Sequence, residues 1–178
     1  MTSITKQQIH QSEKKKISVS ELTICGAFAA LVCVLTMFIQ VQIIPAEGGM
    51  VHLGNVPLFL AAIIFGKRTG ALAGSIGMAL FDLMGGWVLW APFTFVVVGL
   101  MGYSVGAITE KHHGFRWNVL AIVVACVLKI VGYYIAEGII YGNWIAPAAS
   151  IPGNLVQIGV AAVLVLPIAE VVRRAIRR

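Results

Sequence analysis

A long apolar segment with two charged residues inside it is the feature that most constrains this chain. The segment runs from about Trp117 to Ile140 and contains Lys129 and Glu137. About 20 apolar residues are enough for a helix to cross the hydrocarbon core of a bilayer. A charge at that depth costs roughly 3 kcal/mol on insertion scales, so such residues usually face a protein interior or an aqueous cavity. The segment therefore predicts a membrane helix with one polar face.

Three residues of this segment lie on the same face of the predicted helix. Lys129, Tyr133 and Glu137 follow one another at four-residue intervals, which is close to the helical repeat of about 3.6 residues. The two charged residues are then about 12 Å apart along the helix axis. This face requires either a buried partner or a polar cavity elsewhere in the chain.

The composition extends the membrane assignment to the whole chain. Hydrophobic residues make up 59% of the 178 residues and charged residues only 11%, whereas a soluble domain carries about 25%. The net charge of +6 does not indicate a nucleic-acid partner, because the basic residues lie at the ends of apolar segments rather than in one patch. The cysteines, Cys25, Cys33 and Cys126, lack the spacing of metal ligands. We expect no metal and no cofactor.

The apolar segments predict six transmembrane helices in one all-α domain, residues 18–178, after a flexible cytosolic tail of residues 1–17. The expected spans cover about residues 19–44, 51–66, 70–86, 91–108, 117–140 and 154–172. The second of these is about 24 Å long as a helix, which is short for a hydrocarbon core of about 30 Å.

The basic residues set the expected orientation. Of the 13 Lys and Arg residues, all but Lys129 lie in the tail, at the C-terminal end, or in the turns at residues 67–68 and 111–116. Cytoplasmic segments of membrane proteins carry an excess of Lys and Arg. We therefore expect both termini in the cytoplasm of a multi-pass protein of the bacterial plasma membrane.

Polar and aromatic residues gather in the outer half of this topology, with Lys129 near the middle of the membrane. A polar cavity lined by aromatic rings, above an almost purely apolar inner half, is typical of a solute-binding site. The candidate substrate-binding residues are Glu47, His52, Asn55, Asp82, Trp87, Trp90, Thr94, Lys129, Tyr133, Tyr134, Glu137, Asn154 and Gln157.

Structural interpretations of these residues remain open beside the binding interpretation. Asp82 and Lys129 could form an ion pair that only holds two helices together. Asn154 and Gln157 could cap the last helix and bond to a neighbour. The outer tryptophans could be interfacial anchors.

The chain lacks the common enzyme motifs. It has no phosphate-binding loop, no HExxH, no GxSxG and no carboxylate cluster suited to a metal. A binding subunit that takes its energy from a partner fits better than an ion-coupled carrier, because no inverted repeat is visible. Two alternatives stay open: a structural subunit, and an intramembrane lipid enzyme that uses Glu137 or Asp82 as a base.

Residues 51–106, VHLGNVPLFLAAIIFGKRTGALAGSIGMALFDLMGGWVLWAPFTFVVVGLMGYSVG, resemble the substrate-binding S components of energy-coupling factor (ECF) vitamin transporters. The resemblance rests on HLGxxP in the first loop, the basic turn FGxxxG, the DLxxGW element and the Pro-Phe-Thr that opens the fourth span. The later IPGNLVQ, residues 151–157, is similar to the start of the last span in several S components. The resemblance covers nearly all of the chain after the tail.

The resemblance implies a non-catalytic bundle of six helices that binds a vitamin or precursor near the outer face. Such subunits dock on one transmembrane coupling protein and two cytosolic ATPases. The branch looks closest to S components for hydroxymethylpyrimidine or pyridoxine, and thiamine, niacin and riboflavin are the alternatives. The family's docking motif, AxxxA in the first span, corresponds here to Gly26 and Ala30, and Ala27 could shift its register.

Overall fold

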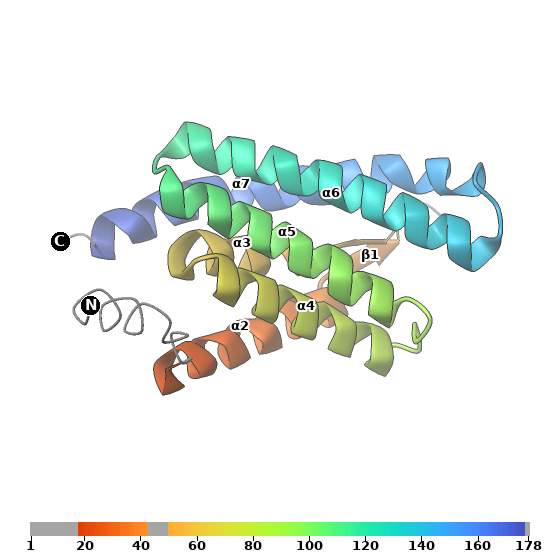
Figure 1. Cartoon of the computed structure of the whole chain (residues 1–178), viewed down its shortest axis with the longest axis horizontal. Coiled ribbons are helices and arrows are strands. Elements are labelled where there is room, and N and C mark those ends of the chain that lie inside the picture. The colour runs from red at the N-terminus through yellow and green to blue at the C-terminus, as the bar shows by residue number, and fades with distance from the viewer. Residues whose placement is uncertain (1–17, 43–49, 177–178) are drawn as a thin grey trace, which may run out of the picture.

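The computed structural model describes residues 18–42 and 50–176, which form six α-helices and a two-stranded sheet (Figure 1). The elements are α2 (Val19–Phe38), β1 (Gln40–Gln42), β2 (Met50–His52), α3 (Asn55–Phe65), α4 (Lys67–Met84), α5 (Ala91–Lys111), α6 (Phe115–Tyr141), the 3-10 helix η1 (Ala146–Ser150) and α7 (Ile151–Ile176).

Local sequence signals begin and end these helices. Ser18 caps α2 by accepting a hydrogen bond from the backbone N–H of Glu21 at 3.1 Å, which is the Ser-x-x-Glu arrangement of a capping box. Gly66 alone separates α3 from α4 and has φ of 93°, a conformation that residues with a Cβ rarely adopt. This sharp reversal lets α4 pack directly against α3.

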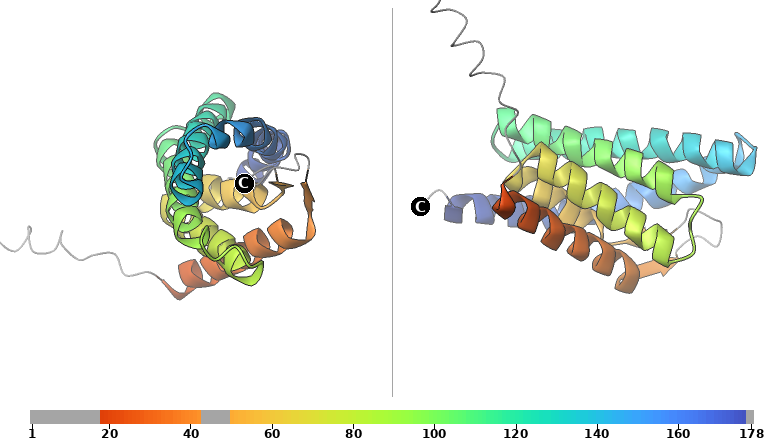
Figure 2. Two further views of the ribbon diagram at one scale, coloured as in Figure 1. Left: turned by 90° about the vertical axis from the view of Figure 1, so that its right-hand side faces the viewer. Right: turned by 60° about the horizontal axis from the view of Figure 1, so that its bottom comes forward.

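The long helices alternate in direction, so the start of α2 and the end of α7 lie at the same end of the bundle (Figure 1). Helix α3 packs against α2, α4, α5 and α7, and the end-on view in Figure 2 shows it among them. It is apolar and largely buried, as expected for a helix without a free face.

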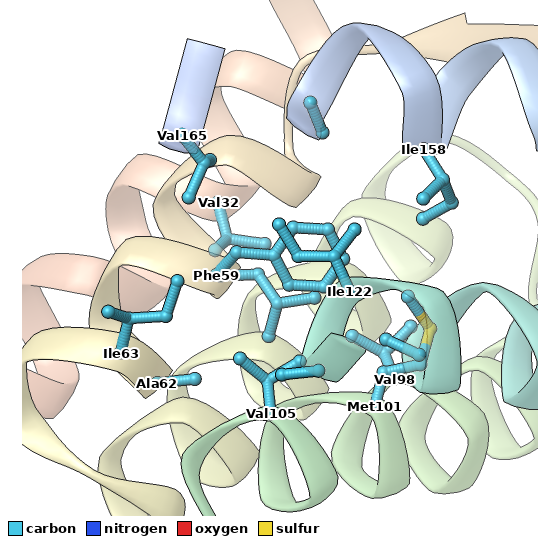
Figure 3. Close-up of a cluster of buried hydrophobic side chains, with 14 of the residues drawn as sticks. Val32, Phe59, Ala62, Ile63, Val98, Met101, Val105, Ile122, Ile158 and Val165 are labelled. Atoms are coloured by element: carbon cyan, nitrogen blue, oxygen red, sulfur yellow. The ribbon is translucent and has the colours of Figure 1, made fainter. Parts of the chain in front are cut away.

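An apolar core fills the bundle around α3 (Figure 3). Phe59 of α3 and Met101 of α5 are fully buried there. On α5 the core begins near Val98, one turn after Thr94, and continues to Val105. The interior is therefore closed by packed side chains below the level of Thr94.

Four helices among the described residues are long and apolar enough to cross a membrane: α2, α5, α6, and the segment Ala146–Ala175 that joins η1 to α7. Helix α3, with 11 residues, is only about 16 Å long. Helix α4 has 18 residues, but Lys67, Arg68 and Asp82 lower its hydropathy. Length and composition thus identify four membrane-crossing helices where the sequence analysis expected six.

The expected end of the first span was wrong. Helix α2 ends at Phe38 rather than near residue 44, and β1 then pairs antiparallel with β2, with Val41 opposite Val51. Residues 39–42 alternate apolar and polar, which is a strand pattern rather than a helical one. The all-α prediction overlooked this period of two inside a longer apolar run.

Small residues allow close contact between α4 and α5. A Cβ added at Gly102 would lie 2.4 Å from the carbonyl oxygen of Gly70, and one at Gly106 would lie 2.3 Å from the Cα of Lys67. At Gly26 on α2 an added Cβ would meet nothing within 4 Å. The glycines of α5 thus pack inside the bundle, and Gly26 lies on its surface.

We expect Gly102→Ala to destabilise the fold by about 1–3 kcal/mol, because the new methyl group overlaps backbone atoms of α4 that cannot move independently. The matched variant Gly26→Ala should leave stability unchanged or raise it by up to about 1 kcal/mol. Thermal unfolding of both variants in detergent checks this. Equal stability of the two would show that the helices adjust freely.

The end of the bundle opposite β1 and β2 is more polar than the apolar sequence of this half predicts. Arg173 donates to the Asn118 side chain at 3.4 Å, to the carbonyl of Ile63 at 3.0 Å and to that of Thr109 at 3.3 Å. Its guanidinium group therefore joins α7 to α3, α5 and α6.

Candidate functional site

A cavity of about 100 Å³ lies at the end of the bundle where α4 ends and α7 begins. Its walls come from β2, α4, the α4–α5 connection, α5, α6 and α7. The lining residues are Met50, His52, Met78, Phe81, Asp82, Trp87, Trp90, Thr94, Lys129, Tyr133, Glu137, Asn154 and Gln157. Residues from positions 50 to 157 of the sequence thus line one polar and aromatic chamber.

Of the predicted site residues, two that the structure describes do not line this cavity, and a third cannot be placed. Glu47 lies outside the described residues. Asn55 is fully buried at the start of α3, away from the lining. Tyr134 points elsewhere, and its hydroxyl donates to the backbone carbonyl of Trp144. Tyr133 and Tyr134 diverge because consecutive residues on a helix are about 100° apart.

Three lining residues were not predicted from the sequence: Met50, Met78 and Phe81. Two methionines and a phenylalanine have the composition of ordinary core side chains, so polarity does not distinguish them. Met78 and Phe81 precede Asp82 on α4, and Met78 lies one helical turn from it, so helical spacing from a buried carboxylate could have identified them.

Tyr133 is the centre of the aromatic wall. Its ring centroid lies 6.3 Å from that of Trp90, and its hydroxyl donates to Thr94 Oγ1 at 3.3 Å. The Nζ atom of Lys129 lies 5.1 Å from the centre of the Tyr133 ring, within the range of a cation–π interaction. Trp90 also meets the edge of Tyr141 at 5.9 Å. Flat faces held from several sides suit the stacking of a planar ring.

Three charged side chains are buried around the cavity without touching one another. Asp82, Lys129 and Glu137 are 8%, 3% and 2% exposed. The ion pairs within 4.0 Å in the described part of the chain are Lys67–Glu110 and Arg174–Glu170. Asp82 and Lys129, both described in the structure, therefore do not form the direct ion pair that the sequence left open.

We expect Lys129→Met to stabilise the ligand-free protein by about 1–4 kcal/mol, because it removes a buried cation that no described carboxylate contacts. Thermal unfolding in detergent measures this, with Arg174→Met as a control at an exposed position. The control should change stability by less than about 1 kcal/mol. A lower unfolding temperature for Lys129→Met would instead support the alternative in which Lys129 holds the bundle together.

His52 on β2 faces the cavity as a neutral hydrogen-bond donor. Its Nδ1 accepts a hydrogen bond from the backbone N–H of Gly54 at 3.2 Å. Burial, with a smaller contribution from the positive charge of Lys129, holds the pKa of the imidazole well below its ordinary value. Because Nδ1 is an acceptor, the proton is on Nε2.

The two amide side chains of α7 differ in their contacts. Asn154 Nδ2 donates to the carbonyl oxygen of Ser150 at 3.2 Å, so it is partly engaged within its own segment. Gln157 is 2% exposed, and its Nε2 has no hydrogen-bond partner in the described structure. Gln157 thus retains a donor at the cavity wall.

The chain is similar to known membrane transport proteins over most of its length. Residues 16–174 match the family model described as "ECF-type riboflavin transporter, S component". The thiamine precursor transporter HmpT of Lactococcus lactis is 29% identical over 157 residues, which cover 88% of this chain and 90% of that protein. An uncharacterized protein of Pyrococcus woesei is 32% identical over 111 residues, covering 62% of this chain and 74% of that one.

A solved structure of the S component of a bacterial ECF transporter shares the fold. The match has a TM-score of 0.72 with 17% sequence identity. The alignment covers 89% of this chain and 98% of that one. The helical arrangement around the cavity is therefore an arrangement already seen in a transporter subunit.

Proposed function

This chain belongs to the S-component family of ECF-type transporters, and from that premise we propose that its cavity captures a small vitamin precursor. The protein is a multi-pass membrane protein and a transporter subunit, which is a non-catalytic role. The observation that carries the ligand proposal is the cavity itself, where the Trp90 and Tyr133 rings lie beside buried charged groups that lack direct ion-pair partners among the described residues.

The proposed substrate is hydroxymethylpyrimidine. The similarity to a thiamine precursor transporter over nearly the whole of both chains supports a ligand of this kind. The cavity volume of about 100 Å³ is small beside the about 300–1,000 Å³ of drug-sized pockets, which favours a single ring. Trp90 and Tyr133 would stack on that ring, and Glu137 would accept from its hydroxymethyl group. Pyridoxine, of similar size, is the nearest alternative.

Riboflavin is the second candidate, because the matching family model is described as a riboflavin transporter component. Riboflavin carries three fused rings and a sugar-alcohol chain, so it would require the cavity to enlarge well beyond about 100 Å³. Thiamine and niacin complete the set of vitamins that the sequence left open.

The proposed topology has six spans with both termini in the cytoplasm, as the Lys and Arg distribution indicates. Helix α3 is too short to cross alone, so it would extend only part of the way, packed between its neighbours. The end of the bundle with the cavity would then open to the outside, and the end with Arg173 would face the cytoplasm.

The exposed face of α2 is the proposed docking surface for the coupling protein. Gly26, Ala27 and Ala30 are exposed on this helix, and its buried side consists of Cys25, Ala29, Val32 and Thr36. A smooth strip of small residues allows another membrane helix to approach closely. Two cytosolic ATPases bound to the coupling protein would supply the energy.

The substrate proposal is tested by identifying the small molecule that remains bound to the purified protein. We expect mass spectrometry to detect hydroxymethylpyrimidine in protein purified without added vitamins, and to detect none in a Glu137→Leu variant, which has no acceptor at this position. Recovery of riboflavin, or of a lipid alone, would contradict the proposed substrate.

A further inference from the structure

Two cavity-lining residues contain buried polar atoms that have no hydrogen-bond partner among the described residues. They are Oδ2 of Asp82 and Nε2 of Gln157. One is an acceptor and the other a donor. Because a buried polar group without a partner destabilises a protein, most such groups in native proteins are satisfied. A ligand that carries both a donor and an acceptor would satisfy both.

Two hydroxyl groups, those of Tyr133 and Thr94, line the cavity together with the Asp82 carboxylate. The Tyr133 hydroxyl donates to Thr94 Oγ1 at 3.3 Å, and Thr94 and Asp82 line the same cavity, where the threonine hydroxyl interacts electrostatically with the carboxylate. A threonine hydroxyl has a single proton. Because Thr94 accepts from Tyr133, its own proton is available to the carboxylate, whose Oδ2 atom has no partner among the described residues.

The backbone beside Asp82 is also held in place. The N–H of Trp87 donates to the carbonyl oxygen of Asp82 at 2.7 Å, where α4 ends and the connection to Trp90 begins. The carboxylate and the stacking ring of Trp90 are thus joined through one short segment.

The chemistry of a carboxylate limits which ligand groups it can bind. An ionised carboxylate only accepts hydrogen bonds, and bonds to a charged acceptor are stronger than neutral ones. A ring nitrogen next to an exocyclic amino group offers an acceptor and a donor side by side. Pyridoxine, niacin and riboflavin have no exocyclic amino group on a ring.

We propose that Asp82 is the residue that selects an amino-substituted heteroaromatic ring, accepting a hydrogen bond from the amino group while Gln157 donates to the adjacent ring nitrogen. This inference rests on the proposed function and specifies which groups of the ligand the protein recognises. Thr94 is a positioning residue, since it acts through Asp82.

The test compares two ligands on the unmodified full chain by isothermal titration. One is hydroxymethylpyrimidine, which has the amino group, and the other is its desamino analogue. The analogue leaves the Asp82 carboxylate without a donor, so we expect it to bind roughly 10- to 100-fold more weakly. Equal affinity for the two compounds would overturn the role of Asp82 and leave the proposed function standing.

Two variants extend the comparison. In Asp82→Asn the preference for the amino compound over the desamino analogue should fall. This variant should also bind more tightly to the oxo analogue, in which a carbonyl group replaces the amino group, because an asparagine amide can donate to a carbonyl. Thr94→Val should reduce the preference, and Thr94→Ser should restore it. An unchanged preference in both Asp82→Asn and Thr94→Val would overturn the inference. If neither pyrimidine binds the unmodified chain and another vitamin does, the proposed substrate fails together with the inference.

Discussion

Replacing Tyr133 with alanine is expected to weaken hydroxymethylpyrimidine binding by about 10- to 100-fold, as for other stacked ring ligands. The substitution removes the ring that lies 6.3 Å from Trp90 and the hydroxyl that bonds to Thr94. It also removes the ring face near the ammonium group of Lys129. Isothermal titration of the purified variant in detergent gives the dissociation constant.

The adjacent residue provides the matched control for this variant. Tyr134→Ala removes the same side chain from the next position of α6, but its hydroxyl bonds to the backbone of Trp144 and its ring does not line the cavity. We expect this variant to keep its affinity for the ligand. Equal losses at Tyr133 and Tyr134 would show that damage to α6, rather than loss of stacking, explains the effect.

Replacing Gly26 with tryptophan is expected to abolish co-purification with the coupling protein and the ATPases. An indole ring would protrude from the smooth strip formed with Ala27 and Ala30, and helices in lipid require small residues for close approach. The isolated chain should fold and bind ligand normally, because the position is open in the structure. Affinity purification of the whole complex from co-expressing cells measures assembly.

A tryptophan elsewhere on the lipid-facing surface controls for bulk alone. Val163 on α7 is 74% exposed and lies on a different helix from the proposed docking surface. Val163→Trp should assemble like the unmodified chain. Normal assembly of Gly26→Trp would refute α2 as the docking surface, and failure of both variants would show that any added bulk is harmful.

The family and most of the cavity lining could be predicted from the sequence. The match over residues 16–174 confirms the family resemblance seen in the sequence. The four-residue spacing of Lys129, Tyr133 and Glu137 is a local property of a helix, and these side chains do face one cavity. Their role in binding stays a prediction.

Features that depend on contacts between distant segments could not be predicted from the sequence. The pairing of β1 with β2 decides where α2 ends, and that pairing joins residues 8 to 12 positions apart in the sequence. The opposite charges of Asp82 and Lys129 left an ion pair open in the sequence, but the two side chains do not form one. Their separation depends on how α4 and α6 are placed, which the sequence does not show. Arg173 likewise finds its partners on three other helices.

The most direct test of the central claim is an equilibrium titration of the purified full chain in detergent, without ATP or partner proteins. The panel consists of hydroxymethylpyrimidine, pyridoxine, thiamine, niacin and riboflavin. We expect tight one-to-one binding of hydroxymethylpyrimidine, with every other compound weaker, and loss of that binding in Tyr133→Ala. If none of these compounds binds, or if the tightest ligand binds equally well to Tyr133→Ala, the cavity is not the vitamin site.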